Sequence, residues 1–161
     1  MRSWRRSGLF VLLLALVTSP GLTSCAHLVI LHDPLTASEH GDLGVAYESG
    51  GQLDLAAKEY RRALKLDPAQ SRTRVNLGNV QVAQGQWQAA EKSYRRALRD
   101  SATNADAMNN LAVALVRQGR HWDEARALAE AAIATGESDS TYRATLAEVN
   151  ASAHEHGMTP K

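Results

Sequence analysis

Leucine, small and aromatic positions recur along the middle of the chain at intervals of 34 residues. The interval relates Tyr60-Arg61-Arg62-Ala63-Leu64 to Tyr94-Arg95-Arg96-Ala97-Leu98. It also relates three sets of single residues. The first set is Leu43, Leu77 and Leu111, the second is Gly44, Gly78 and Ala112, and the third is Gly51, Gly85 and Gly119. Small residues allow two helices to approach closely, where a large side chain would overpack the contact. The pattern therefore predicts pairs of helices that cross at the second set. The third set suits helix C-termini, where a left-handed backbone costs little only for glycine.

These residues and their spacing resemble the tetratricopeptide repeat (TPR), a 34-residue helix–turn–helix unit. The resemblance implies an all-α solenoid with repeats at residues 37–70, 71–104 and 105–139. The second repeat departs from the family pattern at Gln81, where an aromatic residue is usual. The third has one inserted residue in its turn, at Arg120-His121-Trp122, and Ala129 replaces the aromatic residue of its second helix.

The last repeat of a solenoid exposes an apolar face that another element must cover. Tyr142, Leu146 and Val149 follow one another at positions i, i+4 and i+7, which places them on one side of a helix. We therefore expect a capping helix at residues 140–156, followed by a short tail at 157–161.

Residues 1–24 have the pattern of a bacterial secretory signal. A basic start with Arg2, Arg5 and Arg6 precedes nine consecutive apolar residues, Leu9 to Val17. A membrane-spanning helix needs about 20 apolar residues, so this run is too short for a stable span.

The next residues, Leu22-Thr23-Ser24-Cys25, resemble the lipobox of bacterial lipoproteins. The resemblance implies that Cys25 becomes the mature N-terminus, carries lipid and anchors the protein to a membrane of the cell envelope, facing the periplasm. Ala26 follows it rather than the Asp of an inner-membrane signal, which favours the outer membrane. Residues 25–36 would then be a spacer. The alternatives are a secretory signal cleaved elsewhere and an uncleaved anchor.

Composition excludes several other functions. A single cysteine rules out an intramolecular disulfide framework and a zinc site built from several thiolates. The net charge is +1 for the chain and −2 without residues 1–24, so no basic field indicates a nucleic-acid partner. The placement of the histidines favours solvated or helix-end positions over a metal site. Among them are His40, His154 and His156. No cofactor is predicted.

No nucleophile, phosphate-binding or metal-binding motif is present, so we do not expect an enzyme. In TPR proteins the first helices of the repeats line a concave groove that holds a peptide or a partner helix. The positions that match this groove are Arg72, Asn76 and Asn79 in the second repeat and Asn109, Asn110, Val113 and Arg117 in the third. Asparagine amides can bind a peptide backbone without reading its sequence, and arginines favour carboxylates. The alternative is that Asn76, Asn79 and Asn110 only bridge neighbouring helices.

Part of this set resembles the carboxylate clamp of chaperone-binding TPR domains. Asn79 and Asn110 occupy the asparagine positions of that clamp, but Val75, Thr141 and Thr145 stand in place of its basic residues. The resemblance therefore does not extend to a clamp for an acidic C-terminus.

Two arginine pairs, Arg61-Arg62 and Arg95-Arg96, recur with the repeat. This recurrence favours a solvated outer face of the second helices. The alternative is a basic stripe for anionic lipid or murein.

Together these features predict a membrane-anchored periplasmic TPR adaptor that binds a protein or an extended peptide. Envelope assembly, secretion and pilus biogenesis are settings that the resemblance allows. The alternatives are a self-associating structural subunit, a regulatory partner of a periplasmic peptidase and a small metal-binding protein.

Overall fold

The computed structural model describes residues 33–136 and 139–157, and those from residue 34 onward belong to one compact unit. The predicted signal segment, the lipobox, Cys25 and residues 25–32 of the spacer lie outside the described residues.

The described residues form seven helices and no strand. In chain order the helices are α1 (Ala37–Ser49), α2 (Leu53–Leu66), α3 (Ser71–Ala83), α4 (Trp87–Asp100), α5 (Ala105–Arg117), α6 (Trp122–Ala134) and α7 (Asp139–Glu155). The prediction of an all-α fold with three helix–turn–helix units and a C-terminal capping helix is confirmed.

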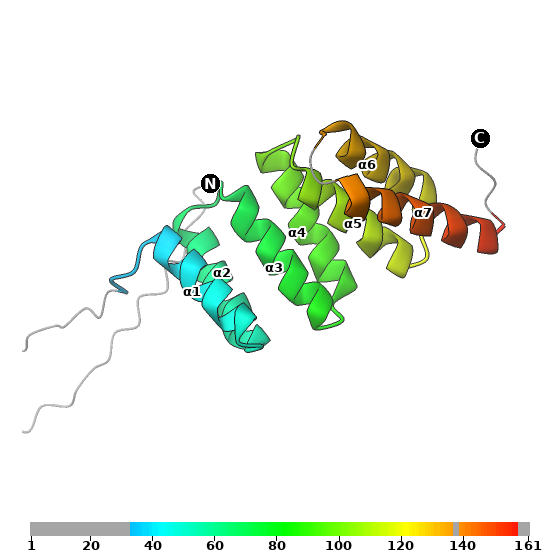
Figure 1. Cartoon of the computed structure of the whole chain (residues 1–161). Coiled ribbons are helices and arrows are strands. Elements are labelled where there is room, and N and C mark those ends of the chain that lie inside the picture. The colour runs from blue at the N-terminus through cyan, green and yellow to red at the C-terminus, as the bar shows by residue number, and fades with distance from the viewer. Residues whose placement is uncertain (1–32, 137–138, 158–161) are drawn as a thin grey trace, which may run out of the picture. The chain divides into compact units, whose positions relative to one another are not determined.

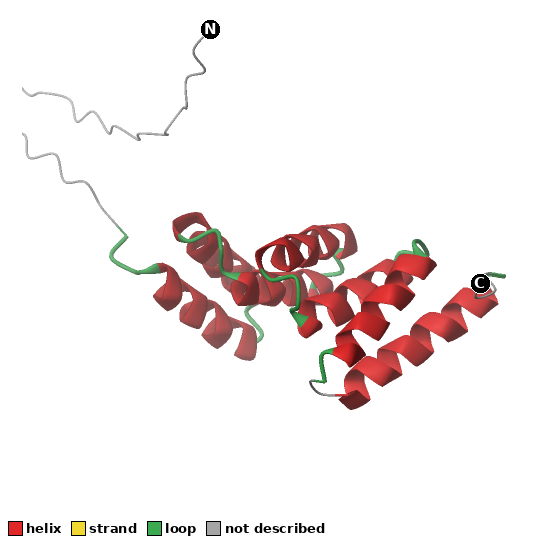
Figure 2. Cartoon of the chain, turned by 90° about the horizontal axis from the view of Figure 1, so that it is seen from above, coloured by secondary structure: helices red, strands yellow, loops and turns green. Residues whose placement is uncertain are grey.

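The helices form three successive hairpins, α1–α2, α3–α4 and α5–α6, and α7 packs against α5 and α6 (Figure 1). Each hairpin contacts the next through its second helix, as α2 does with α3 and α4 with α5. Seen from above, the connections between the helices from α1 to α6 are short (Figure 2). This stacking places the first helices α1, α3 and α5 next to one another along one face.

The ends of the helices follow local signals in the sequence. Thr36 and Glu39 form a capping box, in which the Thr36 backbone N–H donates to Glu39 Oε2 at 2.7 Å and the Glu39 N–H donates to Thr36 Oγ1 at 3.3 Å. Gly51, Gly85 and Gly119 follow the first helices with φ values of 72°, 73° and 65°. The inserted residue of the third turn is accommodated by a left-handed backbone at His121, with φ of 57°.

The first two hairpins are held by an aromatic ring that lies directly on a glycine. A Cβ added to Gly44 would lie 2.5 Å from Tyr60 Cε1, and one added to Gly78 would lie 2.7 Å from Tyr94 Cζ. Tyr60 and Tyr94 are almost completely buried. The helices can cross at this distance only because these positions have no side chain.

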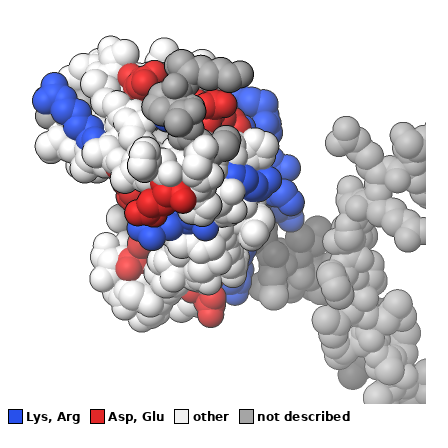
Figure 3. Space-filling model, turned by 90° about the vertical axis from the view of Figure 1, so that its right-hand side faces the viewer, with Lys and Arg blue, Asp and Glu red and all other residues white. Residues whose placement is uncertain are grey.

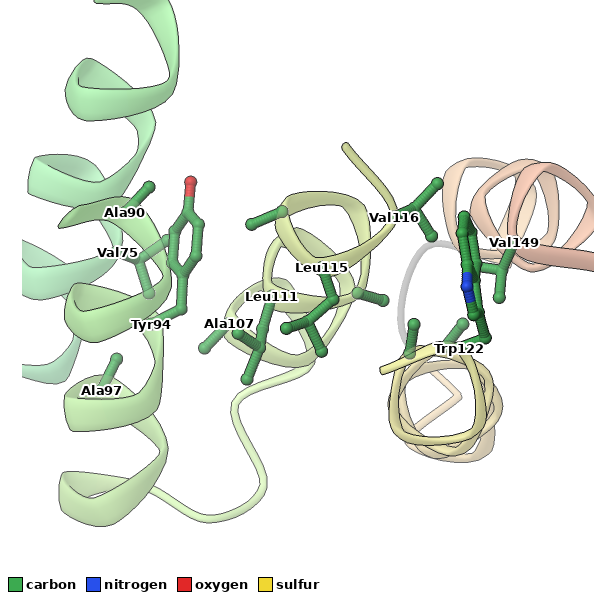
Figure 4. Packing of buried hydrophobic residues seen from close by; sticks show 14 of the residues in the cluster. Val75, Ala90, Tyr94, Ala97, Ala107, Leu111, Leu115, Val116, Trp122 and Val149 are labelled. Atoms are coloured by element: carbon green, nitrogen blue, oxygen red, sulfur yellow. The ribbon is translucent and has the colours of Figure 1, made fainter. Parts of the chain in front are cut away.

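The third hairpin is packed in another way. Ala112 and Ala129 replace the glycine and the tyrosine, and both are completely buried. The large side chain here is Trp122 from the start of α6, which lies beside Val116 of α5 and Val149 of α7 (Figure 4). Val149 and Tyr142 are buried, so α7 covers the end of the solenoid with the side that the sequence predicted.

Two buried polar pairs complete the core of the first two hairpins. Gln81, which replaces an aromatic residue, accepts a hydrogen bond from Ser93 Oγ at 2.7 Å. His40 is 1% exposed, and its Nδ1 lies 2.7 Å from Oε2 of the buried Glu59. His40 lies in the first turn of α1, as predicted, but it is not solvated, because a carboxylate from α2 reaches it inside the hairpin.

Candidate functional site

The seven predicted groove residues lie on two adjacent first helices. Arg72, Asn76 and Asn79 belong to α3, and Asn109, Asn110, Val113 and Arg117 belong to α5. Because α3 contacts α1 and α5, and α5 contacts α7, these helices share one face of the molecule. We call the surface formed by α1, α3 and α5 the first-helix face.

An asparagine bridge joins the two helices at the centre of this face. Asn79 Oδ1 accepts hydrogen bonds from the Tyr94 hydroxyl at 2.8 Å and from Asn110 Nδ2 at 2.9 Å. Asn109 Nδ2 donates to Asn110 Oδ1 at 3.2 Å. The bridge shows that Asn79 and Asn110 connect neighbouring helices, and both residues also remain partly accessible at the surface.

Asn109 does not lie on the exposed surface where the sequence predicts it. The residue is 5% exposed, because neighbouring positions on a helix point about 100° apart and Asn110 takes the outward direction. Its Oδ1 is buried and has no hydrogen-bond partner among the described residues. Asn109 therefore holds Asn110 by a hydrogen bond from the buried side of α5 and does not contribute to the exposed surface.

A second polar group lies nearer to α1. The Tyr60 hydroxyl donates to Glu48 Oε2 at 2.6 Å. Burial and this hydrogen bond raise the pKa of Tyr60, whereas hydrogen bonding with Asn76 and the charge of Arg72 act in the opposite direction. Burial likewise raises the pKa of Tyr94. Both phenols therefore stay protonated and act as hydrogen-bond donors.

Sequence reasoning missed Glu48 and the two phenol groups as parts of this face. The signal was the choice of tyrosine at positions 60 and 94, because a hydroxyl on a ring that is otherwise buried needs a partner. The partners, Glu48 and Asn79, come from the first helix of the same hairpin in each case.

The remaining predicted residues are accessible. Arg72 and Arg117 are exposed, and Asn76 and Val113 are half-buried. Arg117 Nη2 lies 3.1 Å from Glu148 Oε1 of α7, and both side chains are largely solvated. Such a surface pair contributes little to stability, so the guanidinium can exchange partners.

The basic half of a carboxylate clamp is absent from the corresponding positions. Val75 and Thr145 are buried at 6% and 6% exposure, and Thr141 is exposed but uncharged. Acidic and basic side chains are interspersed with uncharged surface on the side of the molecule nearest α7 (Figure 3).

Two clefts open elsewhere on the described surface. One, of about 550 Å³, lies between α2 and α4, and the other, of about 460 Å³, lies at the turn between α1 and α2. Neither is lined by any of the seven predicted groove residues. Within the described ranges, no helix is long and apolar enough to span a membrane, and no group of three or more metal-ligating side chains comes together.

The fold defines a class of protein, the helical-hairpin solenoids, in which stacked helix pairs present their first helices on a common face. Comparison with known families narrows this class. Residues 44–85 match the family described as TPR repeat, and residues 75–140 match the one described as tetratricopeptide repeat. The chain is a tetratricopeptide repeat protein, as its 34-residue period predicted.

Solved structures show the same fold. The Arabidopsis OM64 TPR domain is 21% identical, with a TM-score of 0.68 over 75% of this chain and 96% of that domain. The first TPR of Spaghetti (RPAP3) bound to an HSP90 peptide is 16% identical, with a TM-score of 0.69 over 76% of this chain and 96% of that one. The second TPR domain of human RPAP3, in complex with an HSP70 peptide, is 18% identical, with a TM-score of 0.66 over 70% and 93%.

One curated relative matches a short part of the chain. The human protein O-mannosyl-transferase TMTC4 is 52% identical over 40 residues, which are 25% of this chain and 5% of that protein. The match therefore covers about one repeat of a much longer protein.

Proposed function

We propose that this protein is an adaptor that holds an extended segment of a partner protein across its first-helix face. One observation carries the proposal. The asparagine bridge fixes the partly accessible amides of Asn79 and Asn110 between two helices, with the exposed Arg72 and Arg117 on either side. Fixed amides can exchange hydrogen bonds with a peptide backbone at little entropic cost. The structural neighbours that were solved with HSP90 and HSP70 peptides support a peptide as the ligand.

The proposed recognition does not depend on a basic clamp. Val75 and Thr145 are buried, and Thr141 is exposed but uncharged, where the basic residues of a clamp would stand. The ligand would therefore be held through its backbone, with one or two carboxylates reaching Arg72 or Arg117. This binding role assigns no catalytic step to the chain.

Capture of partners from membranes tests the proposal. The tagged full chain would be compared with an Arg72→Ala/Val113→Ser/Arg117→Ala variant, which changes accessible side chains and leaves the asparagine bridge intact. We expect recovery of specific partners to fall by about tenfold or more, because charge-assisted hydrogen bonds and apolar contact are lost together. Equal recovery by both proteins would refute binding at this face.

A matched control separates the site from general charge effects. Lys58→Ala/Arg99→Ala removes two exposed cations from α2 and α4, neither of which lies on the first-helix face. It should capture partners as the unchanged chain does. Circular dichroism melting of all three proteins checks that each is folded.

The proposal also places the adaptor at a membrane of the bacterial envelope, facing the periplasm, with the outer membrane favoured. Envelope assembly, secretion or pilus biogenesis would be its setting. The support is the lipobox-like Leu22-Thr23-Ser24-Cys25 after an apolar run, which lies outside the described residues. Cys25→Ala should leave the precursor unprocessed or release the protein from membranes. Unchanged processing and membrane retention would overturn the anchor.

A further inference from the structure

The cleft between α2 and α4 has an unusual lining. These two helices each pack on α3 but not on each other, which leaves an open recess of about 550 Å³ on the side of the second helices. All five ionisable side chains of the lining are basic: Arg61, Lys65, Arg74, Lys92 and Arg96. A cleft lined by one sign of charge concentrates the field of that sign.

Four of these cations have no acidic partner among the described residues. Arg74 is paired with Asp100, whereas Arg61, Lys65, Lys92 and Arg96 form no ion pair within the described part of the chain. The repeated arginine pairs explain how this arises. Arg62 is paired with Glu59, and Arg95 is paired with Glu91 and Glu124. One arginine of each pair is thus neutralised by the fold, and the other faces the cleft.

Apolar side chains also line the cleft, namely Leu64, Leu77, Pro68 and Ala89, together with the Gln81–Ser93 pair. Leu77, Gln81 and Ser93 are less than a tenth exposed, whereas the four unpaired cations are exposed, so these three side chains form the floor of the cleft. A flat bilayer surface could reach the outer cations but not this floor, and a small inorganic anion would leave the apolar part unused.

We propose that the α2–α4 cleft is a second binding site, which takes an acidic peptide segment with apolar side chains between its carboxylates. Carboxylates would pair with Arg61 and Lys65 on one wall and with Lys92 and Arg96 on the other. The apolar side chains would cover Leu64 and Leu77. The volume lies within the range of about 300–1,000 Å³ that is typical of ligand pockets. This site goes beyond the proposed function, because it lies on the second helices and shares no residue with the first-helix face.

Fluorescence anisotropy tests this inference with the full chain in non-ionic detergent. The probe is a labelled nonapeptide in which Glu-Glu-Leu occurs three times. We expect it to bind, more weakly as salt is raised, and Arg61→Gln/Arg96→Gln to weaken binding about tenfold. A peptide with lysine in place of glutamate should not bind.

Two controls make the result specific. Lys58→Gln/Arg99→Gln removes the same number of charges from the same two helices outside the cleft and should change the dissociation constant less than about twofold. The first-helix variant Arg72→Ala/Val113→Ser/Arg117→Ala should also leave probe binding unchanged.

Three results of the peptide assay would overturn the inference. They are absence of probe binding, equal weakening by the cleft variant and its charge-matched control, and loss of binding only in the first-helix variant. A cleft variant that loses affinity for phosphatidylglycerol vesicles but keeps its affinity for the peptide would show a membrane site instead.

Discussion

The two sides of the solenoid differ in where their polar side chains find partners. On the first-helix face, Asn79, Tyr94 and Asn110 satisfy one another across three helices. In the α2–α4 cleft, Arg61 and Arg96 find no acid among the described residues. The hydrogen bonds of the first-helix face stabilise the fold and hold the amides in fixed positions. These two cations of the cleft form no ion pair among the described residues that would stabilise the fold. Substitutions should therefore lower stability on one side and leave it unchanged on the other.

The largest effect is expected beneath the first-helix face, at Gly78. A Cβ there would overlap the ring of Tyr94, whose hydroxyl holds Asn79, so Gly78→Ala should lower the free energy of unfolding by about 3 kcal/mol. Gly41→Ala is the matched control, because its Cβ would meet only Thr73 Oγ1 at 3.7 Å. That change should stabilise the helix by about 0.5–1 kcal/mol. Urea unfolding measures both, and equal effects would contradict the close contact.

The next effect comes from the asparagine bridge itself. Asn79→Ala leaves the buried Tyr94 hydroxyl and the Asn110 amide without their shared acceptor, which should cost about 2 kcal/mol. Tyr94→Phe, which leaves the contact between Asn79 and Asn110 in place, should cost about half as much. If Asn79→Ala unfolded at the same urea concentration as the unchanged chain, the bridge would have no structural role.

A smaller effect is expected at acid pH from the ion pairs that join the second and third hairpins. Hydrogen bonding from Arg95 lowers the pKa of Glu124. Burial opposes the same change at Glu91, but hydrogen bonds from Gln118 and Arg95 and the charge of Arg120 outweigh it, so its pKa is also lowered. A lowered folded-state pKa gives stability that is complete above the ordinary carboxyl pKa of 4.5 and is lost as pH falls through the folded value.

Unfolding measured from pH 6 to pH 3 checks this network. An Arg95→Gln variant should lose less stability over that range than the unchanged chain. Its carboxylates lack the interactions with Arg95, so protonating them removes less favourable interaction. The same pH dependence in both proteins would show that the network is not its source.

The smallest effect is expected in the cleft. Arg61→Gln/Arg96→Gln removes two cations that lie among others of the same sign, so stability should stay within about 0.5 kcal/mol or rise slightly. A loss of 1 kcal/mol or more, by urea unfolding, would mean that these side chains have partners in the fold and that the two sides do not differ as described.

Much of the fold could be predicted because it follows from local spacing. The 34-residue period locates the hairpins, Gly78 and Tyr94 recur at the positions where helices meet, and Val149 falls on the buried side of α7. Such features depend on a few neighbouring turns of helix, which a sequence shows directly.

The finer features of the site depend on residues far apart in the chain. His40 is buried because Glu59 of the opposite helix meets it, and Arg95 is neutralised by Glu124, 29 residues later. The structural role of two of the asparagines likewise depends on Asn79 meeting Asn110 across two hairpins. The spacing of residues along the sequence does not reveal any of these contacts.

Site-specific photo-crosslinking in cells tests the central claim most directly. The full chain would carry a photoreactive amino acid in place of Val113 or of Arg117 on the first-helix face, or in place of Lys58 on α2 as the control. Binding across the first-helix face predicts an adduct of the same defined mass at Val113 and at Arg117, and none at Lys58. An adduct at Lys58 alone, or equal adducts at all three positions, would contradict it.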